Sequence, residues 1–120
     1  MPARGQSRIL AAMVADLSLL LDEIEAALRE PPAGGGEAVA RVEETLTDGY
    51  ASVLQLETER LRLERRFGEL AHDLQTAEAG THAEELGDLS QRLSQTREHL
   101  RHLRARLAEL RLHAEAVRTA

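Results

Sequence analysis

The amino-acid sequence predicts an all-α protein: a long antiparallel coiled-coil helical hairpin with a shorter N-terminal helix packed against one end. Two long stretches carry apolar residues at alternating steps of three and four, the spacing of a helix that packs along one seam. Aromatic residues make up only 2% of the chain. No stretch alternates apolar and polar residues as a half-buried β-strand would. At 120 residues, the chain is one domain at most.

The first predicted element is an amphipathic helix over residues 7–30, after a disordered start at residues 1–6. Ser7 is a candidate N-cap. Pro31 and Pro32 cannot continue the helix, and the Gly-rich stretch that follows makes residues 31–36 a flexible linker. The apolar face of this helix is broader than a two-stranded seam requires. It comprises Leu10, Met13, Val14, Leu17, Leu20, Leu21, Ile24 and Leu28.

The second predicted helix covers about residues 37–79 of a hairpin that occupies residues 37–120. Two members of its seam, Gly49 and Arg60, are not apolar. The tripeptide that ends at Gly49 favours a turn, but the unbroken phase on both sides predicts one continuous helix, with a kink at Gly49 as the alternative. The seam is Val39, Val42, Leu46, Gly49, Val53, Leu56, Arg60, Leu63, Phe67, Leu70, Leu74 and Ala77.

The third predicted helix covers about residues 82–118. Gly80 is placed to end the preceding helix, and Thr81 with Glu84 matches a capping box. A stop followed at once by a start predicts a tight turn between antiparallel helices. The seam contains one polar residue, Thr96. It comprises Leu86, Leu89, Leu93, Thr96, Leu100, Leu103, Leu107, Leu110, Ala114 and Val117.

A turn centred near Gly80 predicts which residues face one another across the hairpin. Phe67 then meets Thr96, where a small residue leaves room for the ring, and Gly49 falls near Ala114. A polar residue in an apolar seam can fix the register of two helices. Arg60 and Thr96 are therefore candidate register-setting residues, although a packed Arg60 stem with its head at a nearby carboxylate is the simpler interpretation.

The N-terminal helix is expected to lie beside the first half of the second helix. Tyr50, Leu54 and Leu61 widen the apolar surface there, as a third helix would require. Beyond Arg60 only two helices are expected, and their exposed flanks favour a homodimer that forms a larger bundle. The flexible linker raises the hypothesis that the N-terminal helix detaches or swaps into a second copy.

The net charge of −6 disfavours general binding of nucleic acid, but the charge is uneven. Residues 91–120 hold seven arginines and three acidic residues. One flank of the third helix forms a candidate partner-binding strip. Its arginines have three interpretations: a solvated face paired with the acidic second helix, a docking strip for an acidic partner protein, or a phosphate site. The strip comprises Arg97, Arg101, Arg104 and Arg111.

Several classes of function are disfavoured by what the sequence lacks. There is no cysteine for a thiolate metal site, and Glu69 with His72 is a single pair where a di-metal bundle needs two. No nucleophile lies in a strained turn. No run approaches the ~18 apolar residues of a membrane span. We therefore predict no catalytic residue, cofactor or metal, no membrane partner, and a cytoplasmic protein that is not an enzyme.

These observations predict a non-catalytic protein–protein interaction or regulatory coiled-coil module that binds a partner protein. Two alternatives remain open. One is a structural homo-oligomer whose leucine flanks pair with themselves. The other is a regulator that responds to a nucleotide or nucleic acid through the Arg-rich third helix, although nucleic acid is disfavoured because aromatic side chains for base stacking are absent there. No motif identifies the partner.

Overall fold

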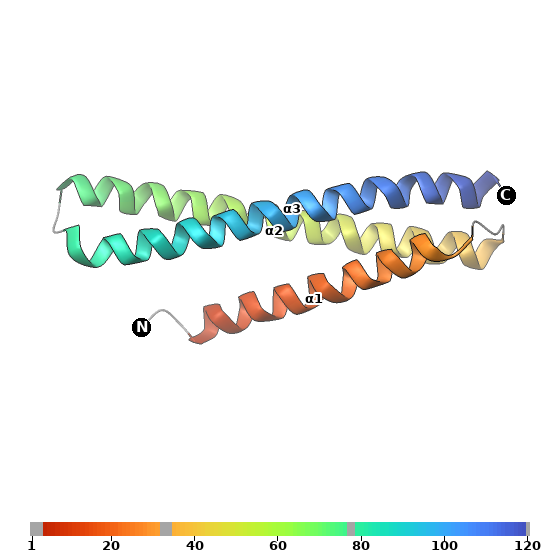
Figure 1. Cartoon of the computed structure of the whole chain (residues 1–120), viewed down its shortest axis with the longest axis horizontal. Helices are drawn as coiled ribbons and strands as arrows, with labels where there is room; N and C mark the ends of the chain where they lie inside the picture. Colours follow the sequence, from red (N-terminus) through yellow and green to blue (C-terminus); the bar gives the residue numbers. More distant parts are fainter. Residues whose placement is uncertain (1–3, 32–34, 77–78, 120) are drawn as a thin grey trace. The chain divides into compact units, whose positions relative to one another are not determined.

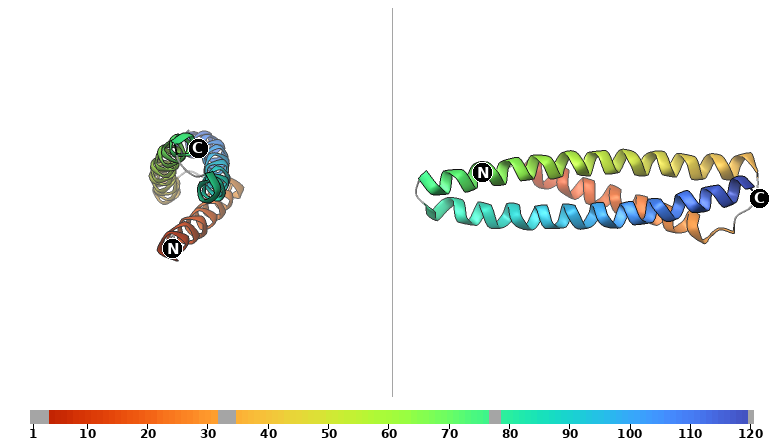
Figure 2. Two further views of the ribbon diagram at one scale, coloured as in Figure 1. Left: turned by 90° about the vertical axis from the view of Figure 1, so that its left-hand side faces the viewer. Right: turned by 90° about the horizontal axis from the view of Figure 1, so that it is seen from above.

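The computed structural model describes residues 4–31, 35–76 and 79–119, and side chains over 15–31, 35–75 and 82–119. These described residues form three helices and no strand, which confirms the all-α prediction. The helices are α1 (Arg4–Arg29), α2 (Gly36–Thr76) and α3 (Ala79–Thr119), each an unbroken ribbon in Figures 1 and 2. The chain divides into two compact units, which are described separately. The first contains α1, α2 up to Ser52 and α3 from Leu103; the second spans Val53–His102.

Helix α1 begins earlier than the sequence predicts. The helix starts at Arg4, so residues 4–6 are helical rather than disordered, and Ser7 lies inside the helix instead of capping it. Residues 1–3 and residues 32–34 of the predicted linker lie outside the described residues. At the start of α2, Gly35 has a φ of 139°, a conformation that favours glycine. Its carbonyl oxygen accepts a hydrogen bond from the Val39 N–H at 3.2 Å.

Helix α2 is continuous through Gly49, as the unbroken seam predicts. Its 41 residues correspond to about 60 Å of helix. Gly49 is buried and faces Leu107 of α3 so closely that a Cβ atom there would overlap the Leu107 side chain. A turn is therefore not the reason for glycine at this position. The glycine lets the two helices approach.

The turn between α2 and α3 differs from the prediction. Helix α2 ends at Thr76 and α3 begins at Ala79. Gly80 and Thr81 therefore lie in the first turn of α3, and neither is the terminator or the cap that the sequence suggests. The Thr81 side chain, on which the proposed capping box depends, lies outside the described residues.

The first unit has a core contributed by all three helices. In α1, the three-and-four spacing places one stripe of side chains inward. The contacts of Gly49 with Leu107 and of Glu43 with Arg118 show that α2 and α3 run in opposite directions here. Among the described side chains of this unit, the buried apolar residues are Leu17, Leu20, Ile24, Val42, Leu103, Leu107, Leu110, Ala114 and Val117.

The second unit is a pair of helix segments held together by leucines. Phe67 and Leu86 are partly buried and pack against a cluster of Leu63, Leu70, Leu89 and Leu93. Leu56 and Leu100 are buried as well. All eight positions belong to the predicted seams, so the periodicity identified these apolar residues correctly. It did not identify Glu59, which is also buried, next to the half-buried seam residue Arg60.

The predicted pairing of layers is nevertheless shifted. Gly49 faces Leu107 instead of Ala114, and Phe67 packs in the cluster with Leu86, Leu89 and Leu93 instead of opposite Thr96. Leu107 and Ala114 are one heptad apart, and the cause is that the turn precedes Gly80. A slip by one heptad keeps every seam residue in the seam and changes only its partner.

Helix α1 lies in one unit with the first part of α2, as expected, but the predicted flank of α2 is wrong. Tyr50, which was expected to lie under α1, is 44% exposed, and Leu54 and Leu61 belong to the second unit. Instead, α1 residues line a cavity together with Ala38 and Thr45 of α2. At about 100° per residue, Ala38 and Thr45 lie on a different flank of α2 from Tyr50.

Paired glycine substitutions test the close approach of the helices. Gly68 lies in α2 with open space around it, so Gly68→Ala should stabilise the protein by about 0.5–1 kcal/mol through helix propensity. Gly49→Ala gains the same propensity but has to displace Leu107, an overpacking cost of about 1–3 kcal/mol. We therefore expect Gly49→Ala to be less stable than Gly68→Ala in urea denaturation. Equal stabilisation by both substitutions would contradict the packing at Gly49.

Candidate functional site

The arginines of α3 divide into those that join helices and those that face outward. In the first unit, Arg106 forms an ion pair with Glu25 of α1 and a second with Glu109 at 2.9 Å. Arg118 binds Glu43 of α2 at 2.5 Å. These two arginines therefore hold α3 to its neighbours, and neither belongs to the strip that the sequence suggested.

Two members of the predicted strip lie in the second unit and have carboxylate partners. Arg97 donates a hydrogen bond to Glu64 of α2 at 3.2 Å, so it connects the two helices. Arg101 binds Glu98 on its own helix. Both side chains remain mostly exposed, at 58% and 74%. Exposed ion pairs of this kind contribute little to the stability of the protein. The two arginines also remain accessible to solvent.

The other two members of the strip, Arg104 and Arg111, lie on the exposed surface of the first unit. They are seven residues apart and therefore occupy one flank of α3. Beside them lie Ala105, Ala108 and Leu112, all exposed, with Leu112 at 74%. We call these five residues the basic face. It is a narrow apolar stripe bordered by two positive charges.

Leu112 is the residue of this surface that the sequence analysis missed. It lies two positions after the seam residue Leu110, so it was not counted as part of any packed surface. The available signal was a leucine outside the seam that directly follows Arg111. A single exposed leucine is ordinary on a protein surface, and the signal was therefore weak without the neighbouring charges.

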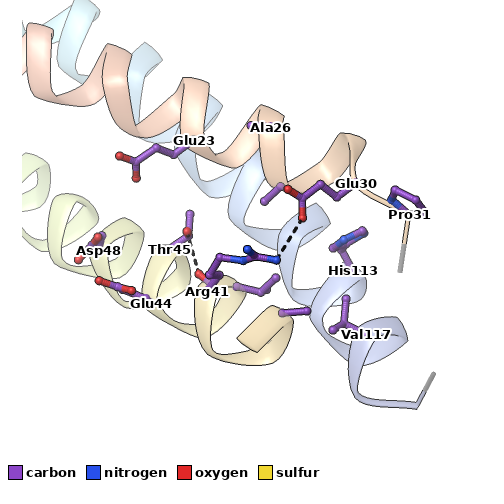
Figure 3. Close-up of a pocket in the computed structure, with 13 residues that line it drawn as sticks. Glu23, Ala26, Glu30, Pro31, Arg41, Glu44, Thr45, Asp48, His113 and Val117 are labelled. Carbon is purple, nitrogen blue, oxygen red and sulfur yellow. Dashed lines mark hydrogen bonds and ion pairs between the residues drawn. The ribbon is translucent and has the colours of Figure 1, made fainter. Parts of the chain in front are cut away.

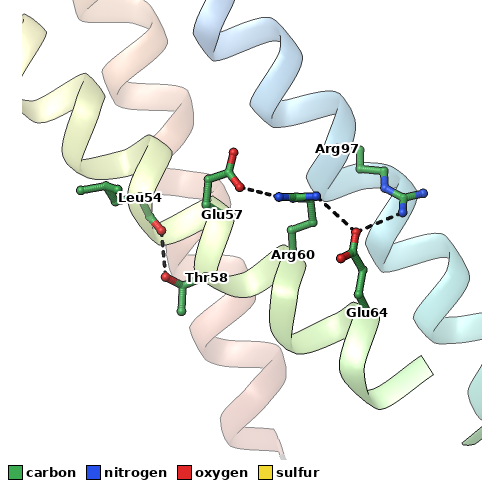
Figure 4. A network of polar contacts seen from close by, with 6 residues as sticks. All are labelled: Leu54, Glu57, Thr58, Arg60, Glu64 and Arg97. Atoms are coloured by element: carbon green, nitrogen blue, oxygen red, sulfur yellow. Dashed lines mark hydrogen bonds and ion pairs between the residues drawn. The ribbon is translucent and has the colours of Figure 1, made fainter. Parts of the chain in front are cut away.

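Of the two candidate register-setting residues, Arg60 belongs to a polar network of the second unit (Figure 4), and the buried Thr96 is adjacent in sequence to a member of that network, Arg97. Arg60 donates hydrogen bonds to Glu57 at 2.7 Å and to Glu64 at 3.3 Å. Glu64 also accepts the bond from Arg97, which directly follows the buried Thr96. The network thus joins α2 to α3 within one helical turn of both polar seam positions. That it selects the register stays a prediction.

A further cross-link in this unit joins Arg66 to Glu85 at 3.1 Å. The hydrogen bond from Arg66 to Glu85 and the charge of Glu85 raise the pKa of the Arg66 guanidinium above its usual value.

The first unit also contains an open cavity of about 440 Å³ between its three helices (Figure 3). Arg41 approaches Glu30 to 3.9 Å at one side. Thr45 donates its hydroxyl to the Arg41 carbonyl oxygen at 3.0 Å, so its hydroxyl hydrogen is already used. The lining residues are Glu23, Ala26, Ala27, Glu30, Pro31, Ala38, Arg41, Val42, Glu44, Thr45, Asp48, His113 and Val117.

The cavity has apolar walls and several carboxylates around it, but the carboxylates do not converge on a point. Among the described residues, no group of three or more His, Asp or Glu side chains is arranged to hold a metal ion. His82, in the second unit, has a buried Nδ1 with no hydrogen-bond partner among the described residues. One such atom does not make a site, so the basic face is the better candidate for binding.

Comparison of the chain with protein-family models, with curated proteins and with solved structures found no match in any of the three. Within the described part of the chain, no helix is both long enough and apolar enough to cross a membrane.

Removing one carboxylate tests the polar network. In Glu64→Gln the ionic part of two hydrogen bonds is lost, and we expect a destabilisation of about 0.5–1.5 kcal/mol in urea denaturation. Glu69→Gln is a matched control, because Glu69 is more exposed and contacts Arg66 only at 3.6 Å. It should cost less than about 0.5 kcal/mol. An equal loss of stability in Glu64→Gln and Glu69→Gln would show that the network contributes no more to stability than a single exposed ion pair.

Proposed function

We propose that this chain is a non-catalytic protein-interaction module that binds an acidic protein surface on the basic face of α3. The observation that carries the proposal is the exposed Leu112 beside the exposed side chains of Arg104 and Arg111 on one face of α3. An apolar residue next to charges of one sign is suited to a partner helix of opposite charge.

The proposed scaffold of this surface is an antiparallel coiled-coil hairpin formed by α2 and α3. Its support is the pair of unbroken heptad seams and the opposed helix directions within each unit. Packing of this kind holds a long helix straight and presents its outer face without a concave pocket. A flat helical face is suited to recognising another helix and gives no enclosure for chemistry on a small substrate.

The charges and the leucine contribute differently to such binding. Burying an exposed leucine side chain gains about 1–2 kcal/mol, whereas arginines at the border of an interface chiefly accelerate encounter and exclude basic partners. The binding that we propose should therefore weaken with added salt, yet persist at salt concentrations that remove purely electrostatic association.

A structural homo-oligomer is a second candidate, because a different surface favours it. Leu54 and Leu61 are 69% and 56% exposed and lie two turns apart on one flank of α2 in the second unit. Their side chains could pair with the same residues of a second copy. Leu61→Glu removes this possibility without touching the basic face, so the two surfaces can be tested separately.

Site-specific photo-crosslinking tests the proposed function. A photoreactive amino acid replaces Leu112 in the full chain expressed in cells, and another replaces the exposed Gln91 in the second unit as a control. We expect acidic proteins to be crosslinked at position 112 well above position 91, with the signal reduced about tenfold by Arg104→Glu with Arg111→Glu. Equal crosslinking at both positions, or a signal that ignores the arginines, would disprove the proposal.

A further inference from the structure

The exposed side of α1 has the opposite character to the basic face. It carries Leu19, which is 62% exposed, between small residues and acidic residues on the outer surface of the first unit. We call this surface the acidic face. Its members, all exposed, are Ala15, Asp16, Leu19, Asp22, Glu23 and Ala26. Each copy of the chain therefore presents an acidic helical stripe and a basic helical stripe, each with a leucine.

We propose that the acidic partner of the basic face is the acidic face of a second copy of this chain. The inference rests on the proposed function and identifies its partner. The net charge of −6 makes two copies repel each other overall. A local pairing of opposite charges offsets this repulsion, and these two faces supply such a pairing.

The charges on the two faces have the same spacing. Asp16 and Glu23 are seven residues apart, as are Arg104 and Arg111, so each pair spans about 10.5 Å along its helix. Helical geometry places Asp16 and Glu23 on one flank of Leu19. The two arginines also lie on one flank of Leu112, but they are rotated from it about the helix axis in the opposite sense to that of the acidic pair from Leu19. When two facing helices run in the same direction, these flanks come together, and both pairs of opposite charges meet at once.

The apolar residues fit the same alignment. With Asp16 opposite Arg104 and Glu23 opposite Arg111, Leu19 falls between Ala105 and Ala108. Leu112 then falls beside Ala26 of the second copy. Each large side chain meets small ones, as interlocking helix surfaces require. Among the described side chains of the first unit, the two leucines are the most exposed large hydrophobic residues, so this contact buries apolar surface that the isolated copy leaves in water.

Two other arginines of α3 in this unit are joined to carboxylates of the same copy. Arg106 pairs with Glu25 and Arg118 with Glu43. Among the described residues, Asp16, Glu23 and Arg111 form no such ion pair. The two faces therefore carry charges of opposite sign at exposed positions.

Charge exchange tests the inference on the full-length chain. The acidic-face variant is Asp16→Arg with Glu23→Arg, and the basic-face variant is Arg104→Glu with Arg111→Glu. Each variant presents two faces of like charge and should repel itself. We expect light scattering to show that the unmodified chain self-associates and that each variant does so at least about tenfold more weakly.

Mixing the two variants provides the decisive readout. The reversed α1 of one variant then matches the reversed α3 of the other, so the mixture should associate although neither component does alone. A single chain with all four substitutions should also associate with itself. Glu84→Arg with Asp88→Arg is the control for the acidic-face variant, because it makes the same change in net charge at exposed positions of the second unit. It should leave association intact, and circular dichroism should confirm helicity in every variant.

Three results would overturn the inference. The first is that the unmodified chain is monomeric at all concentrations. The second is that the mixture of the two variants fails to associate. The third is that Leu61→Glu abolishes an association that the charge exchanges leave unchanged. None of these results removes the crosslinks to other acidic proteins expected at position 112. Failure of the inference and failure of the proposed function are therefore distinguishable.

Discussion

Burial of leucine along a repeating seam is the interaction on which the rest of this structure depends. Aromatic residues are nearly absent, so the core of each unit consists of leucine, with a few Ile, Val and Ala side chains. Each fully buried leucine contributes about 1.5–3 kcal/mol. Without that packing, neither helix of 41 residues would hold its outer face in a fixed orientation. The acidic face and the basic face consist of residues that lie outside these seams and therefore remain on the surface.

The sequence predicted which residues face inward and did not predict which ones meet. A heptad pattern is unchanged when one helix slides past another by seven residues. Gly49 therefore faced Ala114 in the prediction and faces Leu107 in the structure, at no cost to the pattern. The position of the turn decides between the two registers. Gly80 was weak evidence for that position, because a glycine near a helix end can lie inside the helix as well as after it.

The sequence also did not predict the side of α2 on which α1 packs. Tyr50, Leu54 and Leu61 are apolar and close to the seam, and apolar character alone suggested that a helix would cover them. Ala38 and Thr45, small residues on the other flank, line the space beside α1 instead. Small side chains such as these let two backbones approach closely. The residues by which α1 packs into the core are its own Leu17, Leu20 and Ile24, which are buried.

The arginines of α3 illustrate the same limit for the candidate site. Helical spacing grouped Arg97 with Arg104 and Arg111, because spacing gives the angular position of a residue on its own helix. It does not show which side chains of other helices lie nearby. Arg97 is bonded across to Glu64, because a carboxylate of the facing helix is within its reach. Only the packed structure shows which arginine reaches a carboxylate of the facing helix.

Engineered cysteines test the packing register most directly, since the natural chain contains none. Gly49→Cys with Leu107→Cys places two thiols at the close approach of α2 and α3, within the range that a disulfide spans. Gly49→Cys with Ala114→Cys represents the register shifted by one heptad. The account predicts rapid oxidation to an intramolecular disulfide in the first pair and little in the second. Preferential oxidation of the second pair would contradict it.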